Sequence, residues 1–143
     1  MYQKKRKPIN MTCVWDSLIT GVREADMQRV LSLDKRKARA RPEMFIQALK
    51  QQNRPTPGVR WQGTSLRDQE MKENQEWIRD YNVHDIRGGH DTSASDPFFY
   101  LVSDLFGVEI QHTYREHPIR FDPPGTPRYT IRVCSNAGHM NAC

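Results

Sequence analysis

Apolar residues recur at helical spacing through the first part of the chain. A first helix should begin near Thr12 or Cys13, and Gly21 should weaken its last turn. A second helix is expected over about residues 24–37, and Pro42 suits the first position of a third. The apolar stripes of these three helices are Val14, Leu18 and Val22; Met27, Val30, Leu31 and Leu33; and Phe45, Ile46 and Leu49.

Two more helices are predicted in the middle of the chain. Ser65 with Asp68 marks the start of one of them. Asp96 and Pro97 supply an N-cap and a first helical residue for the other, which Gly107 should close. The turn-rich segments that are predicted as loops are 53–63 and 85–95.

From residue 108 onward the apolar residues alternate with polar ones, as in half-buried strands. One strand is expected over residues 108–113 and another over 129–134, with a tight connection at 122–127. Residues 139–143 could pair back as a final strand. Helices followed by a small antiparallel sheet predict an α+β fold.

The length favours one folded domain with one hydrophobic core, because 143 residues is a usual size for a single domain. We expect a basic, flexible tail over residues 1–8 and the domain over residues 9–143. No run of about 18 apolar residues exists, so no membrane span is expected. The basic N-terminus has no apolar segment behind it and does not resemble a secretory signal.

Cysteine usage indicates reduced thiols rather than a disulfide framework, because the chain has only three cysteines, an odd number. The expected location is therefore intracellular, in the cytoplasm, with the nucleus as an alternative. The three cysteines are Cys13, Cys134 and Cys143.

Positive charge is concentrated in the first part of the chain. Residues 1–60 hold 14 Lys and Arg against 5 Asp and Glu, a net +9, whereas residues 61–143 hold 8 against 12, a net −4. Most of the positive charge of this first part lies in two clusters, Lys4-Lys5-Arg6-Lys7, and Lys35-Arg36-Lys37 with Arg39 and Arg41. Basic clusters can contact phosphates or act as nuclear import signals, although many are simply solvated surface.

Cys13 lies where the first helix should begin, and that position favours thiol chemistry. A helix N-terminus carries a partial positive charge, which stabilises a thiolate over a thiol. Its unpaired backbone N–H groups can also stabilise an oxyanion. Cys13 is therefore a candidate nucleophile; the alternative is a small buried residue.

The C-terminal segment supplies a candidate base. His139 follows a predicted strand and a turn that contains Gly138. Asn141 stands two residues later, and residues at positions i and i+2 of a strand point to the same side. Asn141 could therefore orient the His139 imidazole, as in a Cys-His-Asn triad.

These two ends of the chain resemble the ovarian-tumour (OTU) group of papain-like cysteine proteases. The family's nucleophile loop reads Asp-Gly-x-Cys, and the matching residues are Asn10-Met11-Thr12-Cys13. Near its C-terminus the family has a strand, a turn with glycine, and then His-aromatic-Asn or His-aromatic-Asp. Here the matching residues are YTIRVC, SNAG and His139-Met140-Asn141. The short chain resembles a minimal viral or bacterial version of the family.

The resemblance implies a thiol protease that cleaves peptide or isopeptide bonds without a cofactor or a metal. Cys13 would attack the carbonyl, His139 would act as base and acid, and Asn141 would orient it. Asn10 and the backbone N–H of Cys13 would form the oxyanion hole. The implied partner is ubiquitin or a ubiquitin-like modifier, with a viral polyprotein as another substrate.

Three alternatives stay open. The chain could be a basic nucleic-acid-binding module that uses residues 1–41. It could also be a catalytically degenerate interaction domain, because Asn10 and Met11 differ from the family's loop. A zinc site at Cys134, His139 and Cys143 is disfavoured because a structural zinc needs four ligands. His112 is expected to be a packed or an edge residue of a strand rather than a ligand.

Overall fold

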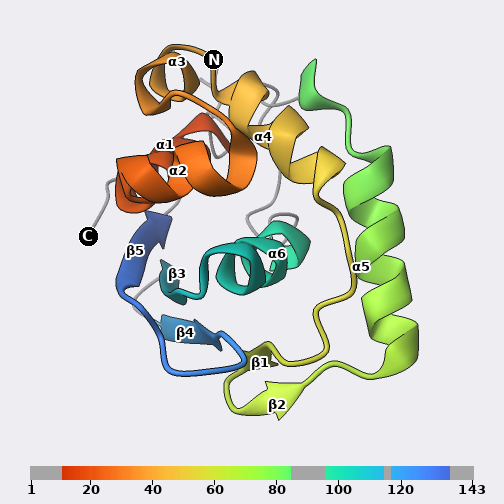
Figure 1. Ribbon diagram of the computed structural model, residues 1–143. Helices are drawn as coiled ribbons and strands as arrows, with labels where there is room; N and C mark the ends of the chain where they lie inside the picture. The colour runs from red at the N-terminus through yellow and green to blue at the C-terminus, as the bar shows by residue number, and fades with distance from the viewer. Residues whose placement is uncertain (1–10, 85–95, 115–116, 136–143) are drawn as a thin grey trace, which may run out of the picture.

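The computed structural model describes residues 11–84, 96–114 and 117–135. Helices α1–α4 gather at one end of the molecule and the strands lie toward the other, with α6 between them (Figure 1). The predicted α+β class is confirmed. The elements are α1 (Met11–Gly21), α2 (Glu24–Leu31), α3 (Lys35–Ala40), α4 (Pro42–Gln51), β1 (Arg60–Trp61), β2 (Thr64–Ser65), α5 (Asp68–Asp80), α6 (Asp96–Phe106), β3 (Glu109–Tyr114), β4 (His117–Asp122) and β5 (Thr130–Ser135).

The sheet is mixed, so the expectation of a purely antiparallel sheet is wrong. Its strand order is β2-β1-β4-β3-β5, and β5 pairs with β3 in parallel. The register joins Ile110 to Ile131 on one side of β3 and to Phe121 on the other. Strand β4 separates the two predicted strands in sequence and had not been expected. Alternating apolar residues show that a strand is half-buried, but they do not show its neighbour or its direction.

One face of the sheet carries the hydrophobic core. Ile110, Phe121 and Ile131 are almost fully buried, whereas Arg120 and Arg132 on the alternating positions are exposed. Helix α6 covers β3 and β4 on the buried face, and α1 packs on β5. This is the pattern of a sheet with one face on the core and one face polar.

The second predicted helix is two helices in the structure. Ser32 adopts a left-handed conformation with φ 52° and ends α2. Asp34 then caps α3, because its side chain accepts a hydrogen bond from the backbone N–H of Arg36. Buried Leu33 lies between the two helices and anchors the break in the core.

The predicted loop at 53–63 also contains a strand. Strand β1 forms a hairpin with β2 through Gln62 and Gly63, whose φ angles of 51° and 84° are those of a tight two-residue turn. The backbone N–H of Gln62 donates to the carbonyl of Arg120, which ties the turn to β4. Strands of two residues are too short to show an alternation of apolar and polar residues in the sequence.

The remaining predicted helices are present, although Ser65, expected at the start of one of them, lies in β2, and Arg67 is the residue that precedes α5. Pro42 is the first residue of α4, Asp68 begins α5, and Asp96 begins α6. Gly107 follows α6 with a φ of 66°, as a closing glycine should. The tail at 1–8, the loop at 85–95 and the final strand at 139–143 lie outside the described residues.

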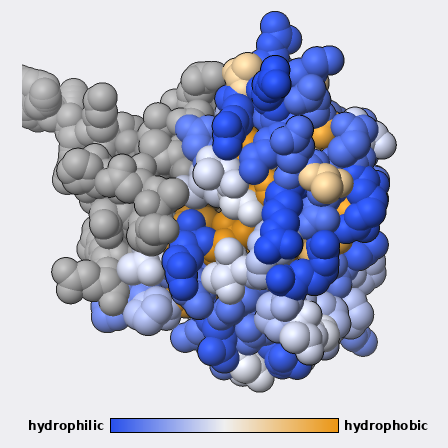
Figure 2. Space-filling model, turned by 60° about the vertical axis from the view of Figure 1, so that its left-hand side comes forward, coloured by the Kyte–Doolittle hydropathy of each residue, from blue (hydrophilic) through white to orange (hydrophobic). Residues whose placement is uncertain are grey.

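The described surface is largely polar. In Figure 2 hydrophilic residues cover most of the coloured face, and hydrophobic residues show mainly in the gaps between them. Within the described ranges, no helix is both long and apolar enough to cross a membrane.

Candidate functional site

Helix α1 carries the candidate nucleophile. The helix begins at Met11, so Cys13 is its third residue and lies in its first turn, where no acidic residue is present. From Val14 onward only Asp16 and Thr20 are exposed, so this helix runs through the interior. The side chain of Cys13 itself lies outside the described part.

An aromatic cluster surrounds the helix just after Cys13. The Trp15 ring lies 4.8 Å from the Phe98 ring and 6.2 Å from the Phe45 ring, both in edge-on geometry. Tyr81 and Trp77 extend the cluster toward α5. Because these rings come from four helices and the segment after α5, they hold the first half of α1 in one position.

The C-terminal end of α1 lies at the beginning of β5. A Cβ atom on Gly21 would lie 2.5 Å from Cγ2 of Ile131, so only glycine permits this approach. The backbone N–H of Arg23 donates to the hydroxyl of Tyr129 over 3.1 Å, and the Arg23 guanidinium stacks 4.1 Å from that ring. The helix that carries Cys13 therefore contacts the strand that precedes His139.

A buried carboxylate fixes this junction. Asp26 is only 3% exposed and accepts hydrogen bonds from Arg128, Tyr129 and Arg29, at 2.7, 2.6 and 3.1 Å. Burial alone would raise the pKa of Asp26, but these hydrogen bonds outweigh it and lower the pKa to about 2. Burial and the bond to Asp26 raise the pKa of Tyr129 to about 12. The cluster is thus a charged anchor at the start of β5.

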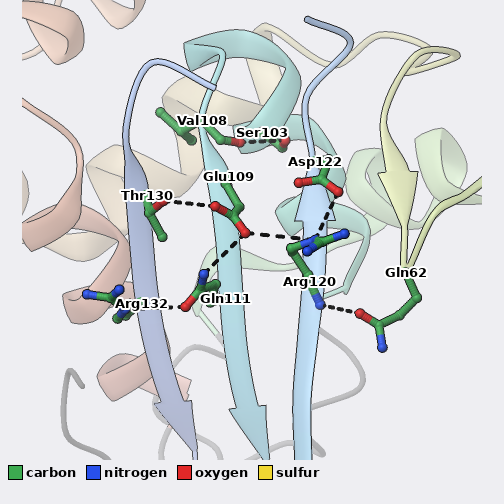
Figure 3. Close-up of polar contacts among 9 residues, drawn as sticks. All are labelled: Gln62, Ser103, Val108, Glu109, Gln111, Arg120, Asp122, Thr130 and Arg132. Atoms are coloured by element: carbon green, nitrogen blue, oxygen red, sulfur yellow. Dashed lines mark hydrogen bonds and ion pairs between the residues drawn. The ribbon is translucent and has the colours of Figure 1, made fainter. Parts of the chain in front are cut away.

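The polar face of the sheet is a connected network (Figure 3). Glu109 accepts hydrogen bonds from Thr130 on β5 and from Gln111 on its own strand, at 2.9 and 3.2 Å. Arg120 on β4 pairs with Asp122 at 3.0 Å and lies 3.8 Å from Glu109. These contacts cross three strands and hold β5 to β3. The network therefore links the strands on the exposed face of the sheet, where Arg120 and Arg132 stay exposed to solvent.

His112 is a packed strand residue, as expected from its place in the alternation. It is 3% exposed, and its ring lies 5.0 Å from the Phe99 ring. Burial lowers the pKa of His112 to about 4, so the imidazole is neutral near pH 7. A neutral, buried imidazole is what a side chain packed in the hydrophobic core requires.

Of the predicted site residues, the structure describes only one. The backbone of Cys13 is placed in α1, whereas Asn10, His139 and Asn141 lie outside the described residues. Among the described side chains, no group of three or more metal-ligating residues is present. No local pattern in the sequence predicts the anchor of Asp26, Arg128 and Tyr129, because more than 100 positions separate Asp26 from the other two residues.

Comparison with known proteins adds no relative. No family model matches the chain, no curated protein is significantly similar to it, and no solved structure matches its fold. The functional argument therefore depends on the residues and their geometry.

Proposed function

We propose that this chain is a papain-like cysteine protease, similar to the OTU group, that hydrolyses peptide or isopeptide bonds. Cys13 is the nucleophile, His139 is the general base and later the acid, and Asn141 orients the imidazole. Asn10 and the backbone N–H of Cys13 stabilise the oxyanion. The substrate is a conjugate of ubiquitin or of a ubiquitin-like modifier, and a viral polyprotein junction is the second candidate.

The contact between α1 and β5 is the observation that supports the proposal. Gly21 packs against Ile131, and the backbone N–H of Arg23 donates to the hydroxyl of Tyr129. The end of α1 therefore lies beside the beginning of β5. Eight helical residues from Gly21 back to Cys13 span about 12 Å. Four strand residues beyond Ile131 span about 13 Å. Because these two lengths are similar, a helix that runs along β5 from this contact has its first turn beside the end of the strand. The strand ends at Ser135, four residues before His139.

The electrostatics of α1 are compatible with an activated thiol. The first turn contains no carboxylate, and the nearest one along the helix is Asp16, at i+3 from Cys13. The partial positive charge of the helix end stabilises a negative sulfur by roughly 0.3–1 kcal/mol at an exposed site. A basic partner such as His139 is therefore still needed to lower the thiol pKa into the working range.

Covalent labelling tests this proposal. A ubiquitin probe with a C-terminal electrophile should label the parent chain and the control variant Cys134→Ser/Cys143→Ser equally. Cys13→Ala should lose labelling completely, because no other group forms the thioether. His139→Ala should slow labelling by at least 100-fold, as removal of a general base does. Matched probes built on ubiquitin-like modifiers identify the preferred modifier.

The degenerate alternative has its own test. The variant Asn10→Asp/Met11→Gly restores the loop of the OTU group, and activity that appears only in it would identify the native chain as an inactive relative. If a folded parent and this variant both ignore every probe and a polyprotein-type peptide library, the protease proposal is wrong. Labelling that survives Cys13→Ala would also refute the assigned nucleophile.

A further inference from the structure

Helix α3 presents a concentration of positive charge. Residues 34–43 hold five basic side chains and two acidic ones, a net charge of +3 in ten positions. Figure 1 shows α3 at the end of the molecule that is farthest from the strands. The exposed members of this set are named here the α3 patch: Arg36, Lys37, Arg39 and Arg41.

Burial divides the basic residues of α3 into two roles. Ala38 is fully buried and fixes the inward side of the helix. Lys35 points inward as well, because its Nζ donates to the carbonyls of Thr20 and Val22 at the end of α1, over 2.9 and 2.6 Å. Burial lowers the pKa of Lys35, and the positive charge of Arg39 lowers it further, so like charges are crowded on this helix.

The α3 patch differs from the other basic side chains of the described residues. Most of those arginines lie in ion pairs, such as Arg54 with Asp104, Arg67 with Glu70, and Arg79 with Asp80. No member of the α3 patch has an ion pair with any described residue. Four other described basic residues are also exposed and without an ion pair, but no two of them belong to the same helix or strand: Arg23, Arg60, Lys72 and Arg132.

We propose that the α3 patch binds the phosphate backbone of nucleic acid. Three of its four residues are arginines, whose guanidinium groups match phosphate oxygens in bidentate geometry. Arg36 and Arg39 are neighbours at i and i+3, with Cβ atoms about 5–6 Å apart. A duplex carries one charge per about 1.7 Å of its axis, so several phosphates fall within reach of a patch of this size.

A lipid surface fits the patch less well than nucleic acid does. Helices that bind membrane surfaces insert large apolar side chains beside their basic ones. Within the described ranges the large apolar residues that are well exposed are Met44 and Trp61, and neither belongs to α3. Met44 on α4 does lie beside Arg41, but a single exposed methionine is not the apolar face that a membrane-binding helix presents.

The patch shares no residue with the proposed catalytic centre. Lys35 ties α3 to the C-terminal end of α1, whereas Cys13 lies eight residues away along that helix, about 12 Å. Nucleic-acid binding and proteolysis can thus be removed separately. The inference holds or fails without reference to the protease proposal.

Fluorescence anisotropy with a labelled DNA duplex of mixed sequence tests the inference on the full chain. Each phosphate contact contributes about 0.9 to the slope of log K against log salt, so the four patch residues should contribute about 3.6 to the steepness of that slope. The variant Arg36→Gln/Lys37→Gln should make the slope shallower by about 1.8 and weaken binding by roughly tenfold or more. The matched control Arg60→Gln/Lys72→Gln removes the same net charge from outside the patch and should keep most of the affinity and the slope.

Three outcomes would overturn the inference. The parent chain could fail to bind the duplex even at low salt. Both double variants could weaken binding equally, which would show that binding depends on the net charge of the protein and not on the α3 patch. Vesicles that contain phosphatidylserine could bind in a patch-dependent way while the duplex does not, which would assign the patch to membranes. Circular dichroism of both variants ensures that any loss of binding is not a loss of fold.

Discussion

The hydroxyl of Tyr129 donates a hydrogen bond of 2.6 Å to Oδ2 of Asp26, although 103 positions separate the two residues. Arg128 donates to the same oxygen over 2.7 Å. Helix α2 is thereby fixed to the first residues before β5. Because β5 leads toward His139 and α2 follows α1, this bond ties together the two parts of the chain that the proposed mechanism needs.

Asp26 should make the stability of the protein depend on pH in the acid range. Its folded-state pKa of about 2 lies below the unfolded value, so the unfolded chain binds more protons between pH 4 and pH 2. The stabilisation by Asp26 is thus complete above about pH 4 and lost as the pH falls toward 2. Asp26→Asn should lower the free energy of unfolding by about 2 kcal/mol at neutral pH and remove this dependence.

Urea unfolding at a series of pH values measures this effect. The matched control is Asp80→Asn, because Asp80 forms an exposed ion pair with Arg79. Its effect should be far smaller than that of Asp26→Asn. Equal effects of the two substitutions would contradict a special role for the buried carboxylate.

His112 should produce a second, separate pH effect. Burial lowers its pKa from 6.5 to about 4, so the unfolded chain binds the extra proton between these values. Stability should therefore fall by up to about 3 kcal/mol as the pH drops from 6.5 to 4. His112→Gln should flatten this part of the curve and leave the dependence below pH 4 intact. Parallel curves for parent and variant would show that His112 titrates normally.

Gly21 should tolerate no side chain. In Gly21→Ala the new methyl group would lie 2.5 Å from Cγ2 and 2.9 Å from Cγ1 of Ile131, a buried branched residue. Overpacking of this kind costs about 1–3 kcal/mol, which exceeds the gain of up to about 1 kcal/mol from helix propensity. Thermal unfolding of the matched control Gly125→Ala should resemble that of the parent, because nothing lies within 4 Å of that position. A stabilised Gly21→Ala variant would contradict the close packing of α1 on β5.

Lys35 should stabilise the end of α1. Its Nζ donates to two carbonyls there, so Lys35→Met should lower the free energy of unfolding by about 1–2 kcal/mol. The exposed Lys37 serves as the matched control, and Lys37→Met should have little effect. Chemical denaturation of the two variants compares them directly. If Lys37→Met proved the more damaging, the division of α3 into an inward and an outward side would be wrong.

The helices were largely predictable because their signals are local. The apolar stripe of Val14, Leu18 and Val22 and the proline at position 42 act within a few residues, and the structure follows them. The break at Ser32 was missed, since a left-handed serine leaves no mark in the periodicity. The parallel pairing of β5 with β3 was missed for a related reason: strand neighbours are chosen by tertiary packing.

The candidate site was predictable only at the level of residue types. Cys13 could be assigned to a helix start, and the structure has it in the first turn of α1. Helix propensity alone makes Gly21 a weak point of that helix, whereas its close approach to Ile131 explains why a glycine stands there. That contact depends on a partner 110 positions away, and no local rule connects the two.

The contact of α1 with β5 also has a consequence for synthesis on the ribosome. Helix α1 is synthesised before the strand that covers its last turn, and that strand is complete only when residues 130–135 are added. Until then the apolar face of the helix has no sheet to pack on, and the nascent chain depends on contacts among its first helices. If Cys13 is the nucleophile, this order also keeps the thiol inactive during translation, because His139 is added later still.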